Sequence, residues 1–172
     1  MTEDMILSWF TQICLALKHI HDRKVLHRDL KSQNVFLTKS NWVKLGDFGI
    51  AKVLEHTKDI AKTVVGTPYY LSPEIIESSP YSFSSDIWSL GVLLYEMAAL
   101  RPPFDAGSLH DLASKIIKGK YPPIPKAYST NLNLLIGTLL QVDPKKRPNI
   151  NQILKYPLIA AKIPQFLEDD LF

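Results

Sequence analysis

The sequence predicts a mainly α-helical domain with one small β-hairpin. Apolar residues recur at helical spacing, or fill whole segments, over most of the chain. By contrast, β-branched and aromatic runs that flank a turn are found at residues 35–45. The 172 residues, of which 46% are hydrophobic and 22% charged, have the size and composition of one globular domain with a proper core.

The residues before His27 are expected to form one helix. Thr2 is suited to the N-cap, and Glu3 and Asp4 stand in the first turn, where the helix dipole favours anions. One apolar stripe then follows the spacing of a helix, and it is formed by Ile6, Phe10, Ile13, Leu17 and Ile20. After this helix, Val25 and Leu26 favour a short strand that leads into the next loop.

A β-hairpin is expected next. Residues 35–38 and 42–45 are rich in β-branched and aromatic side chains, and the tripeptide 39–41 between them is turn-like. Asn34 and Asp47 stand at the two outer ends of this hairpin. The pairing of the strands would bring them close enough to share one ion.

The later part of the chain predicts a series of helices. Residues 83–100 are apolar on nearly every face, so this helix must be surrounded by protein and is expected at the centre of the domain. Pro102 follows its end. A capping box at Ser108 starts the next helix, which ends near Lys118. Further short helices are expected at residues 131–141, 149–155 and 158–167.

Composition excludes several classes of protein. The net charge of +3 is spread along the chain without a tract of like charges, which argues against nucleic-acid binding. No apolar stretch is long enough to span a bilayer. The acidic start of the chain is unlike a signal peptide, and the single cysteine, Cys14, excludes an internal disulfide. A soluble cytoplasmic protein without a membrane partner is expected.

The pattern with the most chemical content lies in residues 27–34 and 47–49. The first segment, His27-Arg28-Asp29-Leu30-Lys31-Ser32-Gln33-Asn34, matches H-R-D-L-x-x-x-N, and Asp47-Phe48-Gly49 matches D-F-G in the same order. Phosphoryl transfer to a hydroxyl needs a carboxylate that orients and deprotonates the hydroxyl, oxygen ligands for Mg²⁺, and a cation over the transferred phosphoryl. Both segments together supply this set.

With these motifs, the chain resembles the C-terminal lobe of a eukaryotic protein kinase. Residues 66–70, 72–74 and 86–91 (Gly-Thr-Pro-Tyr-Tyr, Ser-Pro-Glu and Asp-Ile-Trp-Ser-Leu-Gly) extend the resemblance. More narrowly, the chain is similar to the NIMA-related serine/threonine kinases, on phrases at residues 12–19, 45–51, 71–74 and 104–108. The resemblance implies a partial kinase domain at residues 1–168 with a short tail at 169–172. It also implies the centrosome or cilium as places where such kinases work.

The resemblance implies a role for each residue of the site. Asp29 would orient the substrate hydroxyl, and Lys31 would neutralise charge on the phosphoryl group of ATP. Asn34 and Asp47 would hold Mg²⁺ against the phosphates. Lys31 and the segment around Thr67 are typical of kinases that act on Ser and Thr of protein substrates. Thr67 would form hydrogen bonds towards Asp29 and Lys31.

Regulation is implied by the arginine beside the catalytic carboxylate. Arg28 is expected on the buried side of its loop, where it would pair with a phosphate on the activation segment. Of Thr57, Thr63 and Thr67, we expect Thr63 to carry that phosphate. Structural roles are expected for His27, Phe48, Gly49, Glu74, Asp86 and Arg147. Among these, Glu74 and Arg147 would form a buried ion pair, Asp86 would brace the catalytic loop, and His27 would pack under Phe48.

The 172 residues are expected to contain the C-terminal lobe of a kinase, with its catalytic residues, and not the nucleotide-covering lobe. All seven glycines follow Asp29, so no G-x-G-x-x-G loop precedes it, and neither does a V-A-I-K-like lysine. We therefore expect these residues to be inactive by themselves, although the family is enzymatic. The alternative is a catalytically inert, truncated lobe that binds partners or substrates. Either way, apolar groups near the hairpin and the start of the first helix are expected to be exposed.

Overall fold

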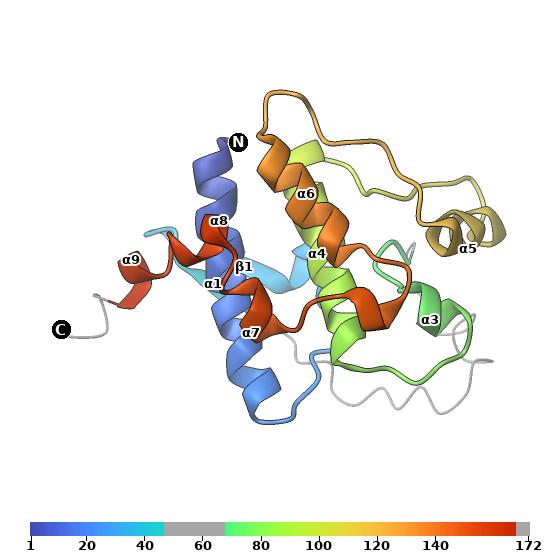
Figure 1. Ribbon diagram of the computed structural model, residues 1–172, viewed down its shortest axis with the longest axis horizontal. Coiled ribbons are helices and arrows are strands. Elements are labelled where there is room, and N and C mark those ends of the chain that lie inside the picture. The colour runs from blue at the N-terminus through green and yellow to red at the C-terminus, as the bar shows by residue number, and fades with distance from the viewer. Residues whose placement is uncertain (47–67, 168–172) are drawn as a thin grey trace.

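The structure is a computed structural model that describes residues 1–46 and 68–167, and it is mainly helical (Figure 1). Residues 47–67 and 168–172 lie outside the described part. The helices are α1 (Glu3–Asp22), α3 (Pro73–Ile76), α4 (Phe83–Ala99), α5 (Leu109–Lys118), α6 (Thr130–Leu139), α7 (Ile150–Ile153), α8 (Pro157–Ala160) and α9 (Pro164–Leu167). Strands β1 (Val35–Leu37) and β2 (Val43–Leu45) form a hairpin, and the 3₁₀ turns are η1 (Ser32–Asn34) and η2 (Pro144–Lys146).

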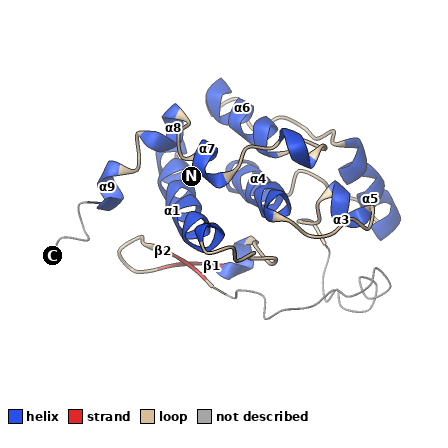
Figure 2. Ribbon diagram, turned by 60° about the horizontal axis from the view of Figure 1, so that its bottom comes forward, coloured by secondary structure: helices blue, strands red, loops and turns tan. Residues whose placement is uncertain are grey.

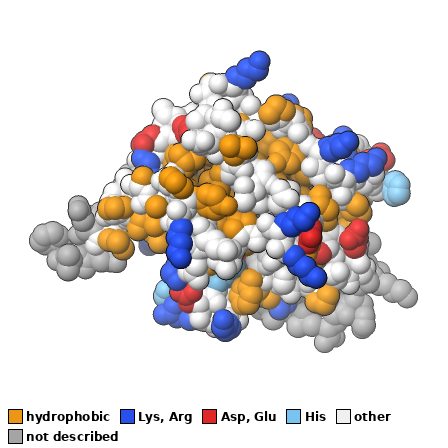
Figure 3. All heavy atoms as spheres, viewed as in Figure 1, with side chains coloured by type: hydrophobic (Ala, Val, Ile, Leu, Met, Phe, Trp, Pro, Cys, Tyr) orange, Lys and Arg blue, Asp and Glu red, His pale blue; other side chains and the backbone are white. Residues whose placement is uncertain are grey.

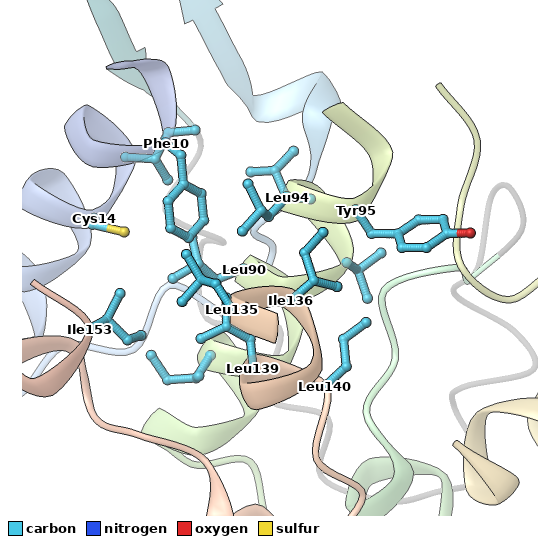
Figure 4. Packing of buried hydrophobic residues seen from close by; sticks show 14 of the residues in the cluster. Phe10, Cys14, Leu90, Leu94, Tyr95, Leu135, Ile136, Leu139, Leu140 and Ile153 are labelled. Atoms are coloured by element: carbon cyan, nitrogen blue, oxygen red, sulfur yellow. The ribbon is translucent and has the colours of Figure 1, made fainter. Parts of the chain in front are cut away.

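Helix α4 forms the centre of the domain, as its apolar sequence predicts. It packs against α1 on one side and α6 on the other (Figure 1). Figure 4 shows side chains of the three helices meeting in one cluster, among them Phe10 of α1, Leu90 of α4 and Ile136 of α6, all fully buried. Each such side chain contributes roughly 1.5–3 kcal/mol of transfer free energy. This core fixes the helices to which the loops of the site are attached.

Gly91 allows α4 and α6 to approach each other closely. A Cβ atom at this position would lie 2.8 Å from Cβ of Leu139 and 2.9 Å from Cδ2 of Leu140. Real Cβ atoms do not come so near, so any larger residue would push α6 away from the core.

The predicted helix ends of α1 and α5 are confirmed. Thr2 caps α1, and its hydroxyl accepts a hydrogen bond from the Met5 N–H at 3.2 Å. The Ser108 hydroxyl caps α5 by accepting from the Asp111 N–H at 3.2 Å. Gly119 follows α5 in the left-handed conformation, with φ of +65°, which glycine adopts without strain.

Two sequence-based predictions of local structure are wrong. Val25 and Leu26 form no strand: the Val25 N–H bonds back to the Ile20 carbonyl, and the described residues offer no partner strand. A strand cannot be stable without a pairing edge, however suited its residues are. Residues 158–167 form two short helices and not one, because Pro164 has no N–H to donate and starts a new helix, α9.

The hairpin lies on α1 with its other face exposed (Figure 2). β1 and β2 are antiparallel, and Val35 is paired with Leu45. Phe36 and Leu37 are 55% and 48% exposed, and Met5 near the start of α1 is 40% exposed. The expected exposure of apolar groups in this region is confirmed.

No helix in the described ranges combines the length and the apolar character that a membrane crossing requires. On the face seen in Figure 3, hydrophobic side chains are spread over the centre, and basic side chains lie among acidic ones towards the edge.

Candidate active site

The loop between α1 and β1, residues 23–34, called the catalytic loop below, gathers three of the predicted site residues. The Asn34 side-chain amide donates to the Asp29 carboxylate oxygen Oδ2 at 3.1 Å and to the Asp29 carbonyl at 2.6 Å. Lys31 Nζ lies 3.4 Å from the other carboxylate oxygen of Asp29. The side chains of Asp29 and Lys31 remain 47% and 38% exposed. A salt bridge this exposed adds little to the stability of the fold.

The contacts of Asn34 fix which end of its amide is the oxygen. Both Asp29 atoms that it meets are acceptors, so the nitrogen Nδ2 must face them. Oδ1 is then on the opposite branch of the amide, and oxygen is the ligand type that Mg²⁺ prefers. The Asn34 amide oxygen, next to the Asp29 carboxylate, is therefore a suitable ligand for Mg²⁺. Within residues 1–46 and 68–167, no three His, Cys, Asp or Glu side chains gather as a metal site.

Asp86, in the first turn of α4, holds the start of the catalytic loop. Its carboxylate is fully buried and accepts from the backbone N–H groups of His27 at 2.9 Å and Arg28 at 3.1 Å. It also accepts from Tyr81 at 2.6 Å, and His21 Nε2 donates to it at 2.8 Å. Burial by itself raises the pKa of Asp86, but these four hydrogen bonds outweigh it and hold the pKa below its ordinary value.

His27 links the catalytic loop to the end of the hairpin. Its ring is fully buried, and Nδ1 accepts from the Asp29 N–H at 3.2 Å. Because Nδ1 accepts, Nε2 carries the proton in the neutral ring and donates to the Gly46 carbonyl at 3.2 Å. Gly46 in turn donates its N–H to the Asn34 carbonyl at 2.8 Å. The two ends of the hairpin are therefore joined directly beside the expected position of Asp47.

Arg28 differs from its predicted placement. It was expected on the buried side of the loop, yet its side chain is exposed. Its backbone adopts the left-handed conformation with φ of +70°, which costs an L-residue about 1–2 kcal/mol. The hydrogen bonds from the His27 and Arg28 N–H groups to Asp86 maintain this conformation. Burying a guanidinium without an anion is unfavourable, and no described residue pairs with it. This explains why it faces solvent.

The other half of the catalytic loop is held by a cluster that the sequence did not indicate. The Ser32 hydroxyl donates to a Glu96 carboxylate oxygen at 3.0 Å, and the Tyr70 hydroxyl donates to the other. The Ser32 N–H donates to the Tyr70 hydroxyl at 3.2 Å. The available signal was Glu96, an acidic residue inside an otherwise apolar helix.

Glu74 and Arg147 form the expected ion pair. Two guanidinium nitrogens meet the two carboxylate oxygens at 2.7 and 2.8 Å, and Arg147 is 6% exposed. Burial by itself raises the pKa of Glu74, but the hydrogen bonds and charge of Arg147 outweigh it and lower that pKa. The guanidinium also lies 5.0 Å above the Trp88 ring. Removing one partner would leave a buried charge, at a cost of roughly 3–5 kcal/mol.

Several predicted site residues lie outside the described part of the chain. They are Asp47, Phe48, Gly49, Thr57, Thr63 and Thr67. The expected metal ligand Asp47 directly follows Gly46, the last described residue of the hairpin.

Comparison with known proteins identifies the family of the chain. Residues 1–159 match the protein kinase domain family. Over 169 residues the chain is 55% identical to mouse serine/threonine-protein kinase Nek1, a match that covers 98% of this chain and 14% of that protein. It is 52% identical over 171 residues to human serine/threonine-protein kinase Nek5, with 99% and 24% covered. It is also 52% identical over 163 residues to human serine/threonine-protein kinase Nek2, with 92% and 37% covered.

The chain therefore spans between 14% and 37% of the length of these relatives. More than half of the chain matches the family, and the fold and the motifs agree with it. The chain belongs to the protein kinase family, on the branch of the Nek serine/threonine kinases.

Proposed function

We propose that the chain carries the catalytic-loop part of a serine/threonine protein kinase, which transfers the γ-phosphoryl group of ATP to Ser and Thr hydroxyls of protein substrates. One observation supports this most strongly. The Asp29 carboxylate is half-exposed, lies 3.4 Å from Lys31 Nζ, and accepts a hydrogen bond from Asn34. Its loop is held from below by a fully buried carboxylate, Asp86. A rigidly positioned and accessible carboxylate beside a cation suits phosphoryl transfer, which depends on positioning and charge.

Each residue of the site would have one task. Asp29 would accept a hydrogen bond from the substrate hydroxyl and take its proton as the hydroxyl oxygen attacks. Lys31 would face the transferred phosphoryl and offset the negative charge that builds up on its oxygens. Asn34, whose nitrogen is engaged by Asp29, would present its oxygen to the metal.

The proposal includes ATP and Mg²⁺. Asn34 and Asp47 would hold the ion, and Lys31 would contact the nucleotide phosphates. When bound, Mg²⁺ neutralises phosphate charge and orients the γ-phosphoryl for in-line attack. Burial of Asn34, which is 5% exposed, fixes its side chain in advance of binding.

Regulation through Arg28 is also proposed. Its exposed guanidinium has no ion-pair partner in the described part of the chain, and this supports a role as receptor for a phosphate, which we assign to Thr63. In an active kinase that carries these residues, Thr63→Ala should lower activity, and Arg28→Ala should lower it to a similar extent. Unchanged activity of Thr63→Ala would contradict this assignment. The cytoplasm, with the centrosome or cilium, is proposed as the place of action.

The proposed function is tested with a chimera. Residues 1–172 replace the matching segment of mouse Nek1, so that the rest of that kinase supplies the nucleotide-covering lobe. The chimera should phosphorylate Ser and Thr peptides and leave Tyr peptides unmodified. Asp29→Asn should lower kcat by at least about 10²-fold. Asp105→Asn, which changes an exposed carboxylate outside the loop, serves as the matched control and should have no effect.

Residues 1–172 alone should show no Mg²⁺-ATP-dependent phosphorylation of a basic substrate, because the missing phosphate contacts each supply about 10²–10³ in rate. Turnover above an Asp29→Ala control would contradict this expectation. A folded chimera without activity would reject the kinase proposal, and would favour a binding module.

A further inference from the structure

We propose that Gln12 is a positioning residue of the metal site: its side-chain amide clamps the β-hairpin to α1 and thereby sets where Asn34 stands. This inference depends on the proposed function, because it concerns the residue to which a metal-binding role is assigned. Gln12 is a polar residue on the buried side of α1 and is 9% exposed.

The amide of Gln12 contacts the hairpin backbone at two points. Oε1 accepts from the Val43 N–H at 2.8 Å, and Nε2 donates to the Asn41 carbonyl at 3.4 Å. One side chain therefore meets an N–H and a carbonyl of the same segment, as a neighbouring strand would. The shorter bond is the stronger of the two.

The Val43 N–H would otherwise have no partner within the hairpin. In the antiparallel register Leu37 is opposite Val43, and the described backbone hydrogen bonds near the turn join Thr38 to Trp42 and to Asn41. With Thr38 bonded to Trp42, the Val43 N–H points away from β1. Gln12 thus completes the free edge of a two-stranded sheet. A half-buried N–H without an acceptor would cost about 1–3 kcal/mol.

Packing alone holds the hairpin weakly. No residue of β1 or β2 is fully buried, and the side chains of Phe36 and Leu37 are 55% and 48% exposed. Apolar contact is non-directional and allows a strand to slide, whereas hydrogen bonds at fixed positions define its place. The Gln12 amide provides such bonds, and its neighbours Ile13 and Cys14 are fully buried in the core.

The effect of the clamp reaches the site through the hairpin ends. Val43 is in β2, which ends at Leu45 and leads directly to Gly46. The Gly46 N–H donates to the Asn34 carbonyl at 2.8 Å, and the Asn34 amide holds Asp29. A shift of β2 along α1 would therefore move Gly46 and Asn34 together.

The first test is amide hydrogen exchange on residues 1–172. Gln12→Met keeps the volume and removes both hydrogen bonds. The exchange rates of the Val43 and Gly46 N–H groups should rise about tenfold, which corresponds to about 1.4 kcal/mol. Thr11→Val is the matched control, because Thr11 is also buried on α1, but among the described residues its hydroxyl bonds to the Leu7 carbonyl of the same helix and not to the hairpin. Thr11→Val should leave both rates unchanged. Equal increases in the exchange rates for Gln12→Met and Thr11→Val would contradict the proposal that Gln12 clamps the hairpin.

The second test uses the Nek1 chimera and separates positioning from general stability. Gln12→Met should raise the Mg²⁺ concentration needed for half-maximal activity about tenfold, with a smaller change in the KM for the peptide. Gln12→Glu keeps the acceptor for the Val43 N–H. The Mg²⁺ concentration that this variant needs for half-maximal activity should therefore be close to that of the wild-type chimera. Thr11→Val should have no effect.

Faster exchange with an unchanged Mg²⁺ requirement would show that Gln12 is merely structural, and would overturn the inference. An inactive wild-type chimera would count against the proposed function alone, because exchange at Val43 and Gly46 still decides whether the clamp exists.

Discussion

Helix α4 holds the catalytic loop at two places, with a carboxylate near each end of the helix. The two carboxylates differ in their position relative to the helix dipole, in their burial and in the kind of donors that contact them. Asp86 stands in the first turn and grips the backbone of His27 and Arg28. Glu96 stands in the last turn and grips Ser32 and Tyr70. The helix dipole favours an anion at the N-terminal turn and disfavours one at the C-terminal turn.

Burial increases the contrast. Asp86 is fully buried and has four hydrogen-bond donors, two of them backbone groups that cannot move away. Glu96 is half-buried, and the donors that meet it are hydroxyls of side chains. A buried charge with fixed partners is costly to disturb, whereas water can replace a partner of a half-exposed one. We infer that Asp86 keeps the catalytic loop folded, whereas Glu96 positions only the second half of the loop, around Ser32.

The largest expected effect is the loss of the buried carboxylate. Asp86→Ala leaves four donors without an acceptor and should lower the free energy of unfolding by roughly 3–5 kcal/mol. Glu96→Ala should lower it by about 1 kcal/mol. Urea titration of both variants measures the difference.

If Asp86→Ala does not fold, Asp86→Asn provides the same comparison, because it keeps one acceptor oxygen and only places an amide nitrogen against N–H donors. Equal losses for the changes at Asp86 and Glu96 would contradict the contrast between the two ends of α4.

The second prediction concerns pH. The pKa of Asp86 is lowered from its ordinary value of 3.8, so its ionisation stabilises the fold above that pH. This contribution should be lost as the pH falls through the lower pKa of the folded state. The difference in unfolding free energy between wild type and Asp86→Asn should therefore be largest above pH 4 and should shrink in more acidic solution.

Glu74 also has a lowered pKa, but it is present in both proteins and cancels in this difference. Denaturant titrations at neutral pH and at several acidic values give the result. A difference that does not change with pH would show that the charge of Asp86 is not what matters.

Local patterns predicted much of the fold. The stripe on α1, the caps Thr2 and Ser108, and the apolar α4 are set by residues near one another in sequence, so periodicity and capping rules are sufficient to predict them. The strand at Val25 was wrong because β-propensity says nothing of whether a partner strand is available.

The site divides in the same way. Asp29, Lys31 and Asn34 are close in sequence, and the structure brings them together. The supports of the loop come from distant segments: Asp86 is bonded to His21, and Glu96 to Ser32. Such contacts depend on how the helices pack, which no local pattern records. The family resemblance indicated that Asp86 would brace the loop, whereas the one indication of the Glu96 cluster was an acidic residue inside an apolar helix.

The third prediction tests the weaker end of α4. Tyr70→Phe removes the hydroxyl that accepts from the Ser32 N–H and donates to Glu96. Burial, with the nearby Glu96 carboxylate, raises the pKa of Tyr70, so the hydroxyl remains a neutral donor. The free energy of unfolding should fall by about 1 kcal/mol, clearly less than for Asp86→Ala.

Tyr69→Phe is the matched control, because the Tyr69 hydroxyl forms no hydrogen bond with any described residue. Thermal unfolding of both variants measures the effect. A loss as large for Tyr69→Phe as for Tyr70→Phe would assign the contribution to ring packing and not to the Glu96 cluster.

The smallest expected effect has the opposite sign. Leu100 ends α4 in the left-handed conformation with φ of +56°, although it is not a glycine and its side chain is 75% exposed. Its N–H bonds to the carbonyl of Glu96 at 2.8 Å, so its strain is stored at the Glu96 end. Leu100→Gly relieves about 1–2 kcal/mol of strain and loses about 0.5–1 kcal/mol to the greater freedom of the unfolded glycine.

A net stabilisation of about 0.5–1 kcal/mol should result, because the exposed leucine side chain contributes little. Leu100→Ala retains a Cβ and the strain, and should give no gain. In the Leu100→Gly variant, hydrogen exchange should slow at the N–H of residue 100, which follows α4, and remain unchanged at the His27 and Arg28 N–H groups bonded to Asp86. Slower exchange at the Asp86 end as well would mean that the two carboxylates belong to one cooperative unit. The proposed difference, in which Asp86 keeps the loop folded and Glu96 affects only its second half, would then be wrong.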